Sequence, residues 1–150
     1  MLRGIPSVLS PEMLMVLAEM GHGDTIAIGD MHYPAASTAT NILLRADGIG
    51  SAELIDAILK VFPLDPQTEK PFLMMEVQAC DADKDFPIQE EYYKLAAKYD
   101  PRGRDAAGTI ERFAFYAAAK KAYAVIATGE KSFYGCTILT KGLVMPEDVI

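Results

Sequence analysis

Apolar residues recur along the chain in two spacings, one typical of amphipathic helices and one typical of buried strands. Between residues 51 and 62 they fall three or four positions apart, on one face of a helix: Leu54, Ile55, Ile58, Leu59 and Phe62. Short apolar runs indicate buried strands at 25–28, 42–44, 72–77, 123–127 and 136–139. Helices and strands are therefore expected to alternate, which is the pattern of a layered α/β domain.

Residues that favour helix ends refine this pattern. The segment 10–12, Ser-Pro-Glu, combines a hydroxyl N-cap, a proline at the first helical position and an acid in the first turn. With Gly21 as a C-terminal stop, it predicts a helix over 11–20. Ser51 is expected to cap the next helix. The other expected elements are helices from 87 and over 112–122, and loops at 34–40, 81–85 and 101–104.

Composition and charge narrow the class of protein. The 150 residues suit one domain, since we find no repeat and no shift in composition. Hydrophobic residues make up 51% of the chain and charged residues only 23%, so a lone monomer would expose apolar surface, which favours a homo-oligomer. The net charge of −7 argues against binding to nucleic acid or to an anionic membrane. No signal-peptide pattern or membrane-spanning run is found, so a cytoplasmic protein with two reduced thiols, Cys80 and Cys136, is expected.

The densest polar cluster brackets the first expected strand. His22 lies between two glycines before this strand, and Asp30 and His32 follow it. Histidine titrates near neutral pH and can move protons, although a single histidine is more often an ordinary loop residue. These three residues could also form a metal site, but they match no zinc-binding motif, and we expect no metal.

A second group of polar and aromatic residues begins the helix expected over 112–122. Arg112 at a helix start opposes the helix dipole, which suggests either a specific partner or a solvated surface residue. Tyr116 lies one turn later on the same face. A planar cation and a phenol on one face suit a ligand with many hydroxyls, and they equally suit a surface. Tyr134, before the last strand, is compatible with a core or a pocket position.

Six motifs occur together in an order that resembles a known family. They are Leu17–Asp24 (LAEMGHGD), Asp30–Ala35 (DMHYPA), Arg45–Gly48 (RADG), Arg112–Tyr116 (RFAFY), Thr128–Glu130 (TGE) and Tyr134–Gly135 (YG). Each motif is weak alone, but six in register over nearly the whole chain are specific. The chain is similar to the fucose mutarotase / ribose pyranase family, and its Arg-Phe-Ala-Phe-Tyr stretch resembles the fucose mutarotase branch.

The resemblance implies a three-layer α/β/α subunit in a ring-shaped homo-oligomer, expected to be a decamer with sites at subunit interfaces. It implies no metal and no organic cofactor. His22 matches the family's catalytic histidine, whereas the sugar-binding positions correspond to Asp30, Arg112, Tyr116, Tyr134, Gly135 and Cys136. Cys136 replaces an asparagine of the family pattern, which puts the identity of the accepted sugar in doubt.

The resemblance therefore implies a mutarotase that interconverts the α and β anomers of L-fucose or a related monosaccharide by acid/base-assisted ring opening. His22 would donate the proton, with Asp30 as a sugar-binding group or an assisting base. Two alternatives stay open at this point: a non-catalytic sugar-binding or regulatory module, and a metal-dependent hydrolase that uses His22, Asp30 and His32.

Overall fold

Five strands of the sheet run in one direction, and a single strand, β6, runs against its neighbours β1 and β3 in the computed structural model, which describes residues 2–149. The strand order is β2-β5-β1-β6-β3-β4. The strands are β1 (Thr25–Gly29), β2 (Ile42–Ala46), β3 (Phe72–Met75), β4 (Ala107–Ile110), β5 (Ala124–Thr128) and β6 (Thr137–Thr140). Because β1, β2, β3, β4 and β5 are parallel, their carboxyl ends meet at one edge of the sheet.

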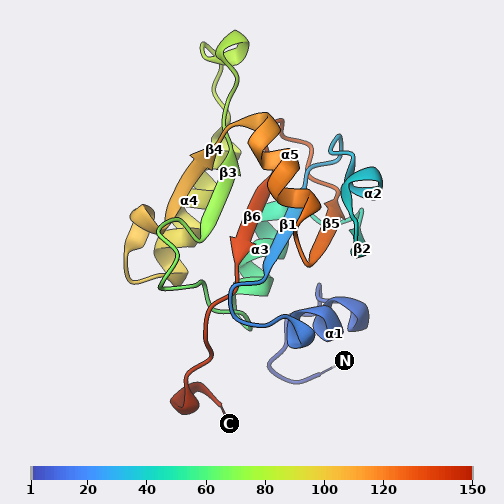
Figure 1. Ribbon diagram of the computed structural model, residues 1–150, viewed down its shortest axis with the longest axis vertical. Coiled ribbons are helices and arrows are strands. Elements are labelled where there is room, and N and C mark those ends of the chain that lie inside the picture. The colour runs from blue at the N-terminus through green and yellow to red at the C-terminus, as the bar shows by residue number, and fades with distance from the viewer. Residues whose placement is uncertain (1, 150) are drawn as a thin grey trace.

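Helices cover both faces of this sheet, so the expected three-layer α/β/α fold is confirmed (Figure 1). The helices are α1 (Pro11–Glu19), α2 (Ala35–Thr38), α3 (Ser51–Leu59), α4 (Pro87–Tyr99) and α5 (Arg112–Lys120). Short 3-10 turns lie at η1 (Ala79–Asp81), η2 (Gly103–Ala106) and η3 (Pro146–Asp148). Residues of α1, α3 and α4 pack on one face, and residues of α5 and α2 pack on the other.

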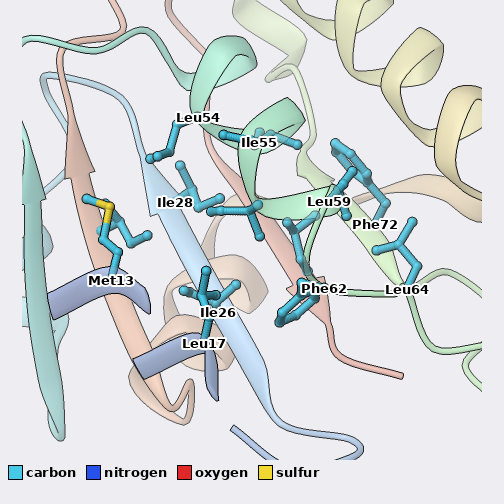
Figure 2. Packing of buried hydrophobic residues seen from close by; sticks show 14 of the residues in the cluster. Met13, Leu17, Ile26, Ile28, Leu54, Ile55, Leu59, Phe62, Leu64 and Phe72 are labelled. Carbon is cyan, nitrogen blue, oxygen red and sulfur yellow. The ribbon is translucent and has the colours of Figure 1, made fainter. Parts of the chain in front are cut away.

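The central strand β1 explains how two cores form on one sheet. Ile26 and Ile28 point into the larger core with α1 and α3, as Figure 2 shows. Ala27, between them, points into the smaller core under α5. All three are fully buried, and each isoleucine contributes about 1.5–3 kcal/mol through its buried side chain. The strand is therefore apolar on both faces, as the sequence pattern predicted.

The structure corrects the expected cap of the second helix. Ser51 is the first residue of α3, and Gly50 occupies the cap position without a side-chain hydrogen bond. The carboxylate of Glu130 instead accepts hydrogen bonds from the Ser51 backbone N–H (3.2 Å) and its hydroxyl (2.9 Å). A residue 79 positions away thus supplies the cap, which no local pattern could reveal.

Several element boundaries also differ from the sequence prediction. The helix expected over 112–122 ends at Lys120, and the strand expected over 72–77 ends at Met75. Among the α-helices and strands two were missed, the one-turn α2 inside the stretch expected to be a loop at 34–40, and the edge strand β4. Within residues 2–149, no helix is long and apolar enough to cross a bilayer.

Candidate functional site

A cavity of about 410 Å³ lies at the edge of the sheet where the parallel strands end. Its volume falls in the usual range for small-molecule pockets, and α/β sheets commonly bind ligands at this edge. It is lined by the last residue of β3, by residues that follow β1, β3 and β4, and by residues that precede β6: Asp30, His32, Tyr33, Met75, Gln78, Asp81, Lys84, Phe86, Arg112, Tyr116, Phe133, Tyr134 and Cys136. Five of the six sequence-predicted binding residues therefore meet in one cavity.

Asp30 and Cys136 form a buried pair at the floor of this cavity. The Cys136 thiol lies 3.3 Å from Asp30 Oδ2 and is its hydrogen-bond donor, while Asp30 Oδ1 accepts the His32 backbone N–H at 3.0 Å. Asp30 is 8% exposed and Cys136 only 2%. Burial, and then the adjacent carboxylate, raise the pKa of the Cys136 thiol well above its ordinary value. The thiol therefore stays protonated and holds one oxygen of the Asp30 carboxylate.

Arg112 and Tyr116 share one face of α5, as predicted. Arg112 Nε donates to the Tyr116 hydroxyl at 3.2 Å, and a guanidinium N–H donates to Gln78 Oε1 at 3.2 Å. The Tyr116 ring stacks on Tyr33 with 5.5 Å between ring centroids. These contacts hold the guanidinium of Arg112 at the cavity wall. Arg112 therefore has specific partners, Tyr116 and Gln78, although its place at a helix start opposes the helix dipole.

Tyr33 lines the cavity and belongs to the DMHYPA motif, but the sequence analysis assigned it no role in the site. Its ring lies against Gly29, where a Cβ atom would come within 2.5 Å of the ring. The Tyr33 hydroxyl is buried and has no hydrogen-bond partner among residues 2–149. Burial raises the pKa of Tyr33 to about 12. The side chain therefore acts as a neutral aromatic wall that supports Tyr116.

Tyr134 and Gly135 form the turn that leads into β6. Tyr134 has φ of 61°, a left-handed conformation that non-glycine residues seldom adopt and that often marks functional sites. Gly135 is required because an added Cβ would lie 2.7 Å from the Glu130 side chain. The Gly135 carbonyl accepts the Tyr92 hydroxyl inside the protein, so the role of Gly135 in this structure is to shape the turn.

His22 does not lie at this cavity. It precedes β1, whereas Asp30 follows β1, and the four residue steps from Thr25 to Gly29 alone span about 13 Å. The expectation that His22 and Asp30 form one polar cluster is therefore wrong within a single chain. His22 belongs to the opposite edge of the sheet, where the neighbouring Gly23 N–H donates to the Lys141 carbonyl at the end of β6.

At that opposite edge His22 pairs with Asp65, a residue that the sequence analysis did not identify. His22 Nε2 lies 3.0 Å from Asp65 Oδ1, and the Thr68 hydroxyl donates to Oδ2 at 2.6 Å. Burial raises the pKa of Asp65, but hydrogen bonds from Thr68, the Gln67 N–H and His22 outweigh it and lower the pKa. The carboxylate can only accept a hydrogen bond here, so the proton is on Nε2, which donates it in the bond to Asp65 and leaves Nδ1 as the other ring nitrogen.

The loop after β3 supplies four further lining residues that the sequence analysis missed: Gln78, Asp81, Lys84 and Phe86. Asp81 and Lys84 fall in the loop expected over 81–85, and Gln78 and Phe86 flank it; nothing in their local pattern distinguishes a cavity wall from a solvated loop. His32 and Phe133 stack on each other at the rim, with ring centroids 5.4 Å apart.

The three residues of the metal-site alternative are not brought together in one chain. Asp30 and His32 lie at the cavity, but His22 lies at the other end of β1. Among residues 2–149 there is no group of three His, Cys, Asp or Glu side chains placed to hold a metal ion.

Comparisons with known proteins show relatives that share most of the chain and its fold. A fucose mutarotase of Danio rerio is 44% identical over 98% of this chain and 97% of its own. The crystal structure of FucU from Bifidobacterium longum is 48% identical, covers 95% of this chain and 100% of its own, and superposes with a TM-score of 0.92. The fucose mutarotase of Streptococcus pneumoniae, solved in complex with L-fucose, is 39% identical with a TM-score of 0.89 and covers 96% of this chain and 100% of its own.

Residues 3–144 match the profile of the RbsD / FucU transport protein family. This match spans every strand of the sheet and each residue that lines the cavity. The chain therefore belongs to the RbsD / FucU family.

Proposed function

We propose that this protein is a mutarotase, a carbohydrate isomerase that interconverts the α and β anomers of L-fucose or a related sugar. One observation carries the proposal: Asp30, Arg112, Tyr116 and Tyr134 converge on one cavity in a chain that is 44% identical to a fucose mutarotase. A relative 39% identical was solved in complex with L-fucose, which supports a monosaccharide as the ligand. Because these relatives are named fucose mutarotases, a non-catalytic sugar-binding module is the less favoured alternative.

The reaction breaks and re-forms one C–O bond, and the steps that a protein must assist are proton transfers. A base takes the proton of the anomeric hydroxyl, the bond between the anomeric carbon and the ring oxygen breaks, and the ring oxygen receives a proton. Reclosure on the other face of the carbonyl gives the other anomer. Spontaneous exchange over minutes to hours corresponds to a barrier of roughly 21–23 kcal/mol. One positioned acid/base group accelerates such a step by about 10²–10⁴-fold, so no cofactor is required.

The cavity residues suit the task of holding the sugar. The Asp30 carboxylate, fixed by Cys136, would accept hydrogen bonds from sugar hydroxyls. The Arg112 guanidinium would donate to sugar oxygens, and Tyr116 and Tyr134 would hydrogen-bond them and cover apolar faces of the ring. Each side chain has a hydrogen-bonded or stacked neighbour, so the sugar would meet a pre-organised wall.

We further propose that His22 reaches this cavity from a neighbouring copy of the chain. His22 carries a partner carboxylate, its side chain is 35% exposed, and it lies far from its own cavity. Phe133, which lines the cavity, is 62% exposed, and two sequence neighbours of lining residues are exposed as well: Met31 at 54%, next to Asp30, and Phe113 at 69%, next to Arg112. Large exposed apolar groups beside a polar site favour cover by another subunit. A ring, expected to be a decamer, would repeat this contact at each interface.

In such a site the Asp65–His22 pair would move the proton. With Asp65 holding Nε2, the free Nδ1 of a neighbouring subunit would face the ring oxygen or the anomeric hydroxyl. We place the protein in the cytoplasm, because its two cysteines, exposed Cys80 and buried Cys136, are both free thiols.

The experiment is saturation-transfer NMR of α/β exchange with L-fucose and a small sugar panel. The wild-type protein should accelerate exchange. His22→Ala should lower the rate by about 10²-fold or more while sugar affinity changes little. Arg112→Ala should weaken binding first. Sugar binding without any accelerated exchange in the wild type would refute the enzyme and favour the binding module.

Mixed oligomers test the two-copy site. His22→Ala and Arg112→Ala subunits are each impaired, but a site between an intact cavity and an intact histidine would form in about one quarter of the interfaces of a random mixture. Co-expression of the two variants with different tags should therefore restore exchange to roughly that fraction. A mixture no more active than the average of the two variants would place His22 outside the site.

A further inference from the structure

The loop of residues 78–86 rises beyond the ends of β3 and β4 and forms one wall of the cavity (Figure 1, the yellow-green segment at the top). The loop contacts two residues of the rest of the site, Arg112 and Tyr134. Gln78 Oε1 accepts a guanidinium N–H of Arg112 at 3.2 Å. The remaining contacts centre on Tyr134, which precedes β6.

Three residues of the loop, Gln78, Asp81 and Phe86, contact Tyr134. The Tyr134 hydroxyl donates to Asp81 Oδ2 at 2.6 Å, and the Gln78 backbone N–H donates to the same hydroxyl at 3.4 Å. The Phe86 ring packs edge-on against the Tyr134 ring, with centroids 4.7 Å apart. Lys84 Nζ bonds the other oxygen of Asp81, Oδ1, at 2.6 Å. Asp81 is thus held between a cation and the phenol.

These bonds fix where the phenol proton points. A phenol has one O–H donor, and Tyr134 uses it in the hydrogen bond to the Asp81 carboxylate, so its oxygen can meet a ligand only as an acceptor. Burial, and then the Asp81 carboxylate, raise the pKa of Tyr134, so the proton stays on the phenol. The backbone supports the same arrangement, because the left-handed φ of 61° aims the side chain toward the loop at a conformational cost.

We propose that Asp81 is a positioning residue that directs the Tyr134 hydroxyl, so that Tyr134 accepts a hydrogen bond from a sugar hydroxyl. The inference rests on the proposed function, because it assumes that the cavity binds a monosaccharide. It adds a determinant of specificity that lies in a loop outside the six motifs. A ligand that offers no hydrogen-bond donor at this position, such as a deoxy or O-methyl analogue, would lose the contact.

Asp81→Asn and Asp81→Ala, in the full chain, test the proposal, with Asp83→Asn as the matched control on the exposed tip of the same loop. Asp81→Ala should raise KM for L-fucose by about 3–10-fold, the scale of one lost hydrogen bond, with a smaller change in kcat. In a Tyr134→Phe background the same substitution should change KM no further, because the hydroxyl it directs is gone. Asp83→Asn should match the wild type.

A second readout does not depend on activity. Titration of ring-labelled tyrosine by NMR, with the Tyr134 resonance identified from Tyr134→Phe, should show a lower phenol pKa in Asp81→Asn than in the wild type. A Tyr134 resonance that titrates identically in both proteins, or additive KM effects in the double variant, would overturn the proposal. Absence of exchange in the wild type, with the Tyr134 shift intact, would instead refute the mutarotase function and leave the Asp81–Tyr134 contact standing.

Discussion

Gly29→Ala is the substitution for which the structure gives the sharpest expectation. An ideal Cβ at this position would lie 2.5 Å from Tyr33 Cδ1 and 2.7 Å from its Cβ and Cγ. Ordinary carbon contacts are about 3.5–4.0 Å, so the ring must move by roughly 1 Å. Tyr33 has little room to move, since it is 8% exposed and lies between the rings of Phe115 and Tyr116.

Overpacking of this kind costs about 1–3 kcal/mol. In a chain of this length each kcal/mol lowers Tm by about 2–4 °C, so we expect a drop of roughly 2–12 °C. Displacement of Tyr33 would also push Tyr116, whose hydroxyl accepts from Arg112. The KM for L-fucose should therefore rise together with the loss of stability.

Gly48→Ala is the matched control, because a Cβ added at this exposed turn meets no atom within 4 Å. It should leave Tm unchanged or raise it slightly, since alanine restricts the unfolded chain more than glycine does. Thermal melts at one protomer concentration, which removes any effect of assembly, and saturation-transfer NMR provide the two measurements. If Gly29→Ala melts within about 1 °C of Gly48→Ala, the packing argument around Tyr33 is refuted.

Three further predictions concern buried polar contacts and cofactors. Cys136→Ala removes the donor to the buried Asp30 carboxylate and should cost about 1–3 kcal/mol in the free energy of unfolding, whereas Cys136→Ser should recover most of it; equal losses would show that packing alone matters. Glu130→Ala removes the acceptor at the start of α3 and should cost roughly 1–2 kcal/mol by urea denaturation. Burial raises the pKa of Glu130, but hydrogen bonds from Ser132 and Ser51 outweigh it and lower the pKa in the folded protein. The contribution of Glu130 to the free energy of unfolding should therefore be complete above about pH 4.3 and lost as the pH falls through the lower folded pKa. A stability difference between wild type and Glu130→Ala that grows on acidification would contradict this sign. EDTA should leave anomer exchange unchanged, and loss of activity restored by a divalent ion would require a metal in the mechanism.

Local patterns in the sequence were enough for most of the fold. Residues 51–59 form a helix because their apolar side chains share one face, and β1 is buried because its residues are apolar on both sides. The strand β4 could not be predicted, because Ala107–Ile110 lacks a distinctive run and becomes a strand through its pairing with β3. The cap at α3 was missed for a related reason, since Glu130 is distant in sequence.

For the site, the sequence by itself determined which residue types are present and in what order, but it left Arg112, Tyr116 and Tyr134 open between a surface or core position and a pocket; Asp30, Arg112, Tyr116 and Tyr134 were named together through the resemblance of six motifs to a known family. Only the tertiary structure decided which of the predicted residues are neighbours. His22 and Asp30 are eight positions apart, yet an extended strand between them places them at opposite edges of the sheet. Asp81 and Asp65 became partners of Tyr134 and His22 only through the fold, because contacts between residues far apart in sequence depend on how the strands are ordered and not on any local pattern.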